Sequence, residues 1–249
     1  MRVLDLFSGI GGFSLGLERA GMETVAFCEI DKHAQKILNK HWPNIPIFED
    51  VCKLNKENFN ETIDVITGGF PCQDLSIAGR KGGLSASRSG LWGEFHRIIG
   101  EYRPKYAIIE NVSNLLTGEN GEWFTKLLYD LSSIGYDAQW HIIPASAVGK
   151  GHHRKRVWVI AYPNQERWDV PEKIFNSISF QISKIRTPRQ VLRLLADFKQ
   201  ISIEEAYPEH RNLDGISEAV DSFERLGNTV VPDIPNIIGN AIMEVESII

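Results

Sequence analysis

The sequence predicts an α/β fold built on a doubly wound, mostly parallel sheet. Short hydrophobic, β-rich runs alternate with amphipathic helical patterns over the first two thirds of the chain. This alternation is typical of βαβ units, in which a helix connects two parallel strands. Glycines or acidic residues follow several of the strands, where doubly wound sheets bind their ligands. With 249 residues, 43% of them hydrophobic, the chain can form one such domain with its own core.

The predicted elements follow in chain order. Strands are expected at residues 2–7, 24–29, 45–48, 63–68, 106–111, 137–143 and 156–162. Helices are expected at residues 12–20, 31–42, 91–101, 121–134 and 233–249, the last returning to cover the sheet. After residue 163 the pattern becomes polar and basic, with one helical stretch at 192–198. We therefore predict a core domain of residues 1–163 plus 211–249, and a small lobe of residues 164–210.

The composition argues against several classes of protein. No apolar run approaches the ~20 residues that span a bilayer, and the N-terminus begins a strand without a signal-peptide pattern. Three cysteines are too few for a disulfide scaffold and leave at least one free thiol. We expect a cytoplasmic monomer that binds no membrane, and we predict no metal site.

The charges are unevenly distributed along the chain. The net charge is −5, yet residues 144–193 carry +7 between a stretch of −4 at 1–143 and one of −8 at 194–249. A basic block in an acidic protein is typical of a local anion-binding face. Nucleic acid is the favoured partner of that face, and an ordinary solvated surface is the alternative.

The ends of the first three strands favour a nucleoside cofactor. The segment Phe7–Gly12 is glycine-rich and opens a helix, which suits close approach of a ligand to the backbone. Glu29 and Asp50 follow the next two strands, where carboxylates can bind ribose hydroxyls or an adenine amino group. Ser14 replaces the third glycine of a dinucleotide fingerprint, which favours S-adenosylmethionine over NAD. A tight structural turn at the glycines is the alternative, as is a helix cap at Asp31 that leaves Glu29 exposed.

The fourth and fifth strands end in residues suited to nucleophilic and acid–base chemistry. Cys72 follows the fourth strand in the loop Gly69–Gln73, and Glu110 lies at the end of the fifth. A cysteine thiolate at this edge can act as a nucleophile beside a carboxyl group that moves a proton. A buried, inert thiol and a helix-capping carboxylate are the alternatives.

Five motifs in order carry a family resemblance. They are Phe7–Gly12, Gly69–Gln73, Glu110–Val112, His152–Arg156 and Leu226–Pro232. Together they resemble the DNA (cytosine-5)-methyltransferases, especially compact bacterial and phage forms. The resemblance implies a Rossmann-like S-adenosylmethionine-dependent methyltransferase domain, with residues 164–210 as a short target-recognition region.

The resemblance also implies a mechanism and a set of site residues. Cys72 would attack C6 of a flipped-out cytosine in duplex DNA, while Glu110 binds N3 and Arg154 and Arg156 contact the base and nearby phosphates. The implied cofactor-binding residues are Phe7, Ser8, Gly9, Gly11, Gly12, Glu29, Ile30, Asp50, Val51, Pro71, Leu91, Asn228 and Thr229. Residues 80–90 match the family's catalytic loop. A cognate restriction endonuclease is a candidate partner.

Three other functions are alternatives for this sequence. A tRNA cytosine-5 methyltransferase would use the same chemistry on a loop of RNA. A catalytically weak DNA-binding relative would have lost Cys72 or Glu110, and both are present. A nicotinamide oxidoreductase is disfavoured by Ser14. The chain departs from the family in its short recognition region, and in Lys150, Gly151 and His152, which stand where relatives carry other residues.

Overall fold

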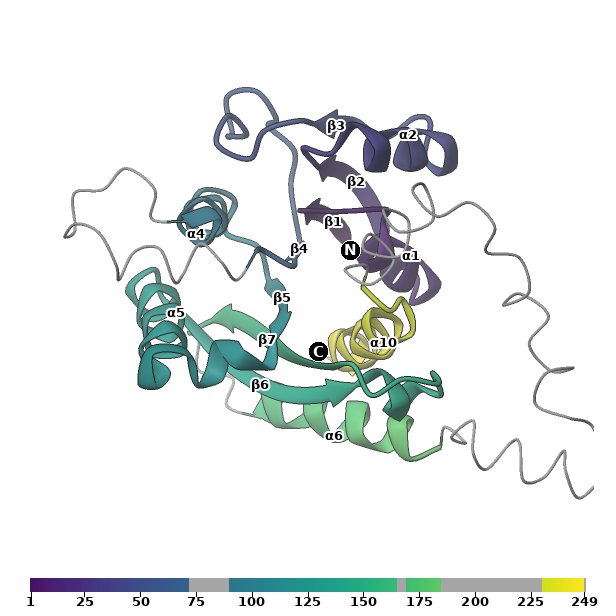
Figure 1. The fold of residues 1–249 in the computed structure, drawn as a ribbon, viewed down its shortest axis with the longest axis vertical. Helices are drawn as coiled ribbons and strands as arrows, with labels where there is room; N and C mark the ends of the chain where they lie inside the picture. Colours follow the sequence, from purple (N-terminus) through teal and green to yellow (C-terminus); the bar gives the residue numbers. More distant parts are fainter. Residues whose placement is uncertain (72–89, 165–168, 185–229, 249) are drawn as a thin grey trace, which may run out of the picture.

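The computed structural model describes residues 1–71, 90–164, 169–184 and 230–248. Within these residues, seven strands form one sheet in the order β3-β2-β1-β4-β5-β7-β6 (Figure 1). Strands β1 to β5 pair in parallel, and β7 runs antiparallel to both β5 and β6. The strands are β1 Arg2–Leu6, β2 Glu23–Cys28, β3 Ile47–Phe48, β4 Val65–Gly68, β5 Tyr106–Val112, β6 Tyr136–Pro144 and β7 Lys155–Pro163. The predicted doubly wound, mostly parallel sheet is confirmed.

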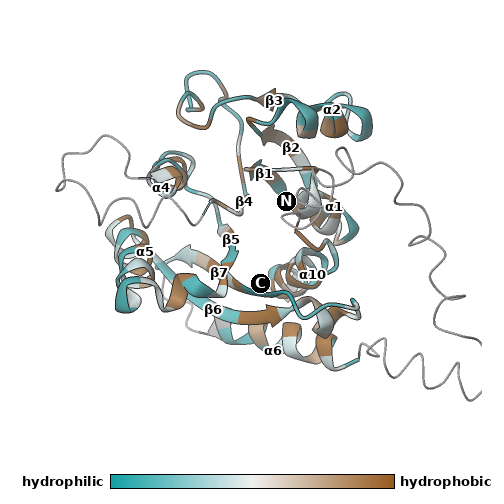
Figure 2. Ribbon diagram, in the orientation of Figure 1, coloured by the Kyte–Doolittle hydropathy of each residue, from teal (hydrophilic) through white to brown (hydrophobic). Residues whose placement is uncertain are grey.

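Helices cover both faces of the sheet. They are α1 Gly12–Arg19, α2 Lys32–His41, α4 Gly90–Tyr102, α5 Glu122–Ser133, α6 Asp169–Ser183 and α10 Asp233–Ile248, with short 3-10 turns at Ser113–Leu116, Gly118–Gly121 and Ala145–Val148. One core cluster joins α4 and α5 to the sheet, and a second joins α1, α6 and α10 to the opposite face. Hydrophobic residues run along β6, α6 and α10 (Figure 2). None of the helices in the described ranges is long and apolar enough to cross a membrane.

The predicted elements that fall on described residues are present, with ends shifted by one or two positions. Strand β3 is shorter than expected because Pro46, which has no N–H to donate, only accepts a bond from the Phe27 N–H at 2.9 Å. Helix α6 was not predicted. Its residues Ile174 and Ile178 are buried in the same core as α10, inside the segment assigned to the recognition lobe. The helix expected at 192–198 lies outside the described residues.

The first helix approaches the C-terminal part of the chain closely because two of its residues are glycines. A Cβ at Gly12 would lie 2.4 Å from the carbonyl oxygen of Val230, and one at Gly16 would lie 2.3 Å from that of Pro232. Both distances are far below van der Waals contact. The glycines therefore let α1 pack directly on the segment that leads into α10.

A buried carboxyl group lies between β1, α1 and β4. Asp5 is fully buried and accepts hydrogen bonds from the Ser14 hydroxyl at 2.7 Å, the Ser14 N–H at 3.3 Å and the Thr67 hydroxyl at 3.0 Å. Burial raises the pKa of Asp5 to about 7, although these bonds act in the opposite direction. The network fixes the start of α1 against the strand from which the glycine-rich loop departs.

Asp5 should make the stability of the fold dependent on pH. A folded-state pKa above the ordinary value contributes stability that is complete below about pH 4 and is lost as pH rises toward 7. Asp5→Asn removes this titration but keeps the shape, since its amide can donate to the Thr67 oxygen and accept from Ser14. The difference in free energy of unfolding between wild type and Asp5→Asn should therefore change by up to about 4 kcal/mol over that range. Urea denaturation at a series of pH values measures it, with Glu23→Gln at an exposed position as the control. Parallel pH curves for wild type and Asp5→Asn would contradict the assignment.

Candidate active site

A cavity of about 360 Å³ lies at the carboxyl edge of the parallel strands. Segments that follow β1, β2, β3 and β4 form its walls, and the first turns of α2 and α4 complete them. Its lining residues are Phe7, Gly9, Ile10, Cys28, Glu29, Ile30, Asp31, His33, Ala34, Glu49, Asp50, Val51, Gly69, Pro71 and Leu91. The cavity occupies the position where doubly wound sheets bind nucleotides.

The carboxylate of Glu29 is held in a fixed orientation at this cavity. Its two oxygens accept from the backbone N–H groups of Gly9 and Asp31, each at 2.7 Å. The bond to Gly9 ties the loop after β1 to the end of β2. Because each carboxylate oxygen has two lone pairs, Glu29 can still accept further hydrogen bonds from a ligand.

Two neighbours of Glu29 have separate roles. Ile30 lines the cavity with 75% of its surface exposed, which offers an apolar wall for a flat ring. Asp31 caps α2 by accepting from the N–H groups of His33 at 2.7 Å and Ala34 at 3.2 Å. The helix cap predicted as an alternative is therefore present. Glu29 nevertheless forms hydrogen bonds of its own at the cavity.

The segment after β3 brings two more carboxylates to the cavity. The Asp50 carboxylate accepts from the N–H of Cys52 at 3.0 Å, and Glu49 forms an ion pair with Lys32. Cys28 also lines the cavity, and burial raises the pKa of its thiol to about 12, so the thiol stays neutral. Carboxylates are thus the charged groups that this wall of the cavity offers to a ligand.

The cavity brings together most of the residues that the sequence assigned to the cofactor. Those that line it are Phe7, Gly9, Glu29, Ile30, Asp50, Val51, Pro71 and Leu91. Ser8 does not line it, because its buried hydroxyl donates to the carbonyl oxygen of Asp5 at 2.6 Å. Gly11 and Gly12 likewise face protein, against Trp42 and Val230. Asn228 and Thr229 lie outside the described residues.

The sequence reasoning missed some of the lining residues. These are Ile10, Cys28, Asp31, His33, Ala34, Glu49 and Gly69. Most of them flank a predicted residue, so the ends of the predicted strands already indicated them. His33 and Ala34 belong to the first turn of a predicted helix at the same edge of the sheet. That position in the helix is the sequence signal that could have indicated them as lining residues.

Next to the cavity, β5 and β7 form a buried ion pair. Glu110 is 7% exposed, and its carboxylate lies 3.0 Å from Nε of Arg156 and 4.0 Å from Nη2 of Arg154. Burial raises the pKa of Glu110, while the two arginines act to lower it. The result is a carboxyl group that takes up a proton more readily than an exposed one and is oriented by a guanidinium group.

The loop after β4 lies against this carboxyl group. A Cβ at Gly69 would lie 3.0 Å from Oε2 of Glu110, so a glycine lets the loop pass close by. The Asn111 side chain donates to the carbonyl oxygen of Phe70 at 2.9 Å and is itself buried. These contacts place Pro71, the residue before Cys72, at the cavity. Cys72 itself and the predicted catalytic loop 80–90 lie outside the described residues, apart from Gly90 in α4.

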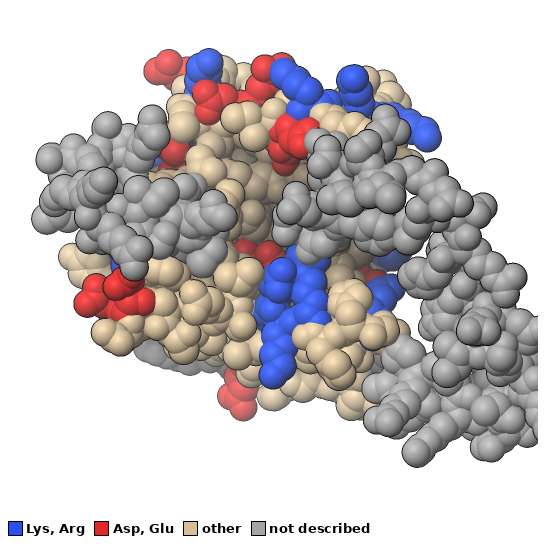
Figure 3. Space-filling view, in the orientation of Figure 1, with Lys and Arg blue, Asp and Glu red and all other residues tan. Residues whose placement is uncertain are grey.

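Basic side chains gather close to the site. Arg154 precedes β7, and Lys155 and Arg156 begin it. The space-filling view shows Lys and Arg atoms clustered near the centre of this face, with acidic atoms set deeper beside them (Figure 3). Lys150 forms an ion pair with Asp233 at 2.8 Å, which links the loop before β7 to the start of α10. Among the described residues, no group of three or more His, Cys, Asp or Glu side chains could bind a metal ion.

Comparisons with known proteins show which proteins this chain is similar to. The chain is similar to the type II methyltransferase M.CviJI of Paramecium bursaria Chlorella virus IL3A, with 39% identity over 72% of this chain and 47% of the relative. It is similar to the type II methyltransferase M2.BsuMI of Bacillus subtilis, with 37% identity over 68% of this chain and 44% of the relative. The chain thus spans about half the length of these curated relatives.

A solved structure and a family model give the same result. The crystal structure of a putative DNA modification methyltransferase encoded within an Escherichia coli prophage matches with a TM-score of 0.56 and 32% identity, over 66% of this chain and 47% of that one. The model of the C-5 cytosine-specific DNA methylase family matches residues 1–241. This match does not favour the alternative of a tRNA methyltransferase. Since nearly the whole chain fits the model, the chain belongs to the C-5 cytosine-specific DNA methylase family.

Proposed function

We propose that this chain transfers a methyl group from S-adenosylmethionine to carbon 5 of a cytosine in duplex DNA. Members of its family use this methyl donor. The observation that carries the proposal is the position of the buried Glu110–Arg156 pair beside a nucleoside-sized cavity, with the Gly69–Pro71 loop between them. The loop leads directly to Cys72.

The residues of the cavity fit a nucleoside cofactor. Glu29 has lone pairs left to accept from ribose hydroxyls, Asp50 offers a second carboxylate, and Ile30 presents an exposed apolar surface. When bound, S-adenosylmethionine supplies an electrophilic methyl group. The carboxylates also match its positive charge, whereas a dinucleotide would bring the negative charges of a pyrophosphate to an acidic wall.

Glu110 and Arg156 would act on the cytosine ring. A carboxyl group with a raised pKa can hold a proton at the N3 atom of the base, which withdraws electrons from C6. Arg156 fixes the direction of the carboxyl group from 3.0 Å away. In this role Glu110 prepares C6 for attack by a nucleophile.

Cys72 would be that nucleophile. Its thiolate would form a bond to C6, which pushes electron density onto C5, the atom that is then methylated. Loss of the C5 proton and breaking of the bond between sulfur and C6 would regenerate the thiolate and the aromatic ring. In a duplex both carbons are covered by stacking, so the base would be flipped out first.

The basic residues would hold the DNA backbone. Arg154, Lys155 and Arg156 lie at the same edge as Glu110, and the block 144–193 carries +7. Because α6 packs into the core with α10, we expect the recognition region to begin after Ser183 rather than at residue 164. This leaves the segment up to residue 210 to read the target sequence.

Removing a cavity carboxylate should weaken cofactor binding. Glu29→Ala and Asp50→Ala should each reduce the affinity for S-adenosylmethionine by about 1–3 kcal/mol, the usual cost of leaving polar groups without partners. Isothermal titration calorimetry measures it. Glu57→Ala, at an exposed position outside the cavity, is the control. Wild-type affinity in both cavity variants would mean that the nucleoside binds elsewhere.

Removing the proposed nucleophile should abolish catalysis but spare the cofactor. Cys72→Ala should show no methyl transfer to DNA, with an affinity for S-adenosylmethionine close to that of wild type. Wild type, but not the variant, should form a covalent complex with DNA that contains 5-fluorocytosine, detected as a shifted band on a denaturing gel. Cys52→Ser, which removes an exposed thiol but keeps a hydrogen-bond donor beside Asp50, should behave as wild type in both assays. Turnover by Cys72→Ala would falsify the covalent mechanism.

Removing the titratable group of Glu110 should slow the chemical step. Glu110→Gln keeps the size of the side chain but cannot transfer a proton to N3, so the single-turnover rate should fall by roughly 10²–10⁴-fold. The affinity for S-adenosylmethionine should not change, because Glu110 is not part of the cavity wall. Glu122→Gln, at an exposed position on α5 outside the cavity wall, is a control of the same chemistry. A rate within a few-fold of wild type would exclude Glu110 as the proton-transfer group.

A further inference from the structure

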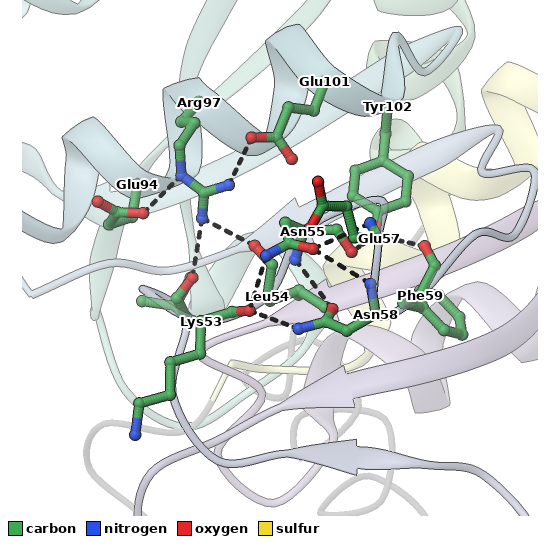
Figure 4. Close-up of polar contacts among 11 residues, drawn as sticks. Lys53, Leu54, Asn55, Glu57, Asn58, Phe59, Glu94, Arg97, Glu101 and Tyr102 are labelled. Atoms are coloured by element: carbon green, nitrogen blue, oxygen red, sulfur yellow. Dashed lines mark hydrogen bonds and ion pairs between the residues drawn. The ribbon is translucent and has the colours of Figure 1, made fainter.

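The segment that carries Asp50 and Val51 is held from outside the cavity by one side chain of α4. Nη2 of Arg97 donates to the carbonyl oxygen of Val51 at 3.1 Å and to that of Leu54 at 2.8 Å (Figure 4). Both carbonyls belong to the connection between β3 and β4. Arg97 is thus separated from Val51 and Leu54 by 46 and 43 positions in the sequence. One of these two partners, Val51, lines the cavity.

The guanidinium group of Arg97 is itself fixed. Its Nε donates to Glu94 at 2.7 Å, and its Nη1 donates to Glu101 at 2.7 Å, along the same helix (Figure 4). A planar group with its donors engaged in three directions has little freedom to rotate. Arg97 thus fixes the connection between β3 and β4 relative to α4.

The turn that Arg97 holds determines where Asp50 points. The carboxylate of Asp50 accepts from the Cys52 N–H at 3.0 Å, and its carbonyl oxygen accepts from the Lys53 N–H at 3.0 Å. Residues 50–54 therefore form one closed turn, with Asp50 at its start and the two carbonyls bound by Arg97 at Val51 and Leu54. Movement of this turn would displace both Asp50 and Val51 in the cavity wall.

The far end of the same connection is held differently. The Tyr102 hydroxyl donates to the carbonyl oxygens of Asn55 at 3.0 Å and Phe59 at 2.6 Å. Asn55 and Asn58 close this part through bonds to their own backbone neighbours (Figure 4). Tyr102 thus anchors a stretch that does not line the cavity, and it provides a matched control on the same helix.

We propose that Arg97 is a positioning residue for cofactor binding, which keeps the 50–54 turn in the place where Asp50 and Val51 face the nucleoside. The inference rests on the proposed function of the cavity. Helix α4 also contributes Leu91 to the cavity wall, six positions before Arg97. Helix α4 therefore supplies both a lining residue, Leu91, and the Arg97 side chain that holds the 50–54 turn, which we call the clamp.

Calorimetry with S-adenosylmethionine tests the clamp without any catalytic step. Arg97→Met should weaken binding roughly tenfold, the order of effect of one hydrogen bond to a charged group. Tyr102→Phe should lower the melting temperature of the protein but keep the wild-type affinity. Glu94→Gln combined with Glu101→Gln removes two charges but keeps an amide oxygen to accept from Nε and Nη1, so the guanidinium group and its two carbonyl contacts stay in place and the affinity should remain that of wild type. If Arg97→Met does not fold, Arg97→Lys serves instead, because a single ammonium group cannot reproduce the fork of contacts.

A double-mutant cycle separates positioning from general stabilisation. If Arg97 acts through Asp50, the losses of affinity in Arg97→Met and Asp50→Ala should not add in the double variant. Additive losses, or wild-type affinity in folded Arg97→Met while Asp50→Ala binds weakly, would overturn the clamp. If Asp50→Ala binds S-adenosylmethionine as tightly as wild type while Glu29→Ala binds weakly, the clamp is overturned and the cavity assignment stands; if both variants bind as tightly as wild type, the cavity assignment fails and the clamp fails with it.

Discussion

Parallel pairing of the first five strands is the constraint on which the site depends. Because β1 to β5 run in one direction, the segments that follow them all emerge at a single edge of the sheet. Strand β7 is antiparallel to β5, so its beginning, not its end, lies at that edge. The pairing of Val112 with Arg156 makes Arg156 a diagonal neighbour of Glu110 on the same face. The fold thus brings the carboxylate of Glu110, near the end of β5, next to the guanidinium group of Arg156, near the start of β7.

Burial of the Glu110–Arg156 pair favours the proposed proton transfer more than it favours the stability of the fold. Removing two charges from water costs free energy that a single ion pair does not fully recover, so such pairs contribute little to folding. Here the cost raises the pKa of Glu110 and leaves Arg156 to orient it. Asp5 shows the same effect of burial, but its three hydrogen bonds come from Ser14 and Thr67 and close it off from a ligand. Asp5 and Glu110, the proposed proton-transfer group, therefore differ in their access to a ligand and not in their burial or charge.

The sequence predicted the strand ends well because their signals are local. Glu29, Asp50 and Glu110 each follow or end a short hydrophobic run, and the topology brings such positions together. The sequence could not show which residues face the ligand: Ser8 and Gly12 belong to the same motif as Gly9, yet they pack against protein. Helix α6 was missed because its apolar residues lie among polar and basic ones, and only contact with α10 shows that they are core. Arg97 was missed because its partners, Val51 and Leu54, are backbone carbonyls more than 40 positions away.

The division of charge along this edge reconciles an acidic protein with the polyanionic substrate proposed for it. The cavity wall carries Glu29, Asp31, Glu49 and Asp50, whereas Arg154, Lys155 and Arg156 lie at the start of β7 and just before it. At physiological ionic strength charges are screened beyond about 8 Å, so a phosphate responds to the groups near it rather than to the net charge of −5. In the proposed function, a cationic cofactor would be attracted to the first group of residues and a DNA backbone to the second. Glu110 lies where the two regions meet, which is where a base would have to be placed to react with a methyl donor.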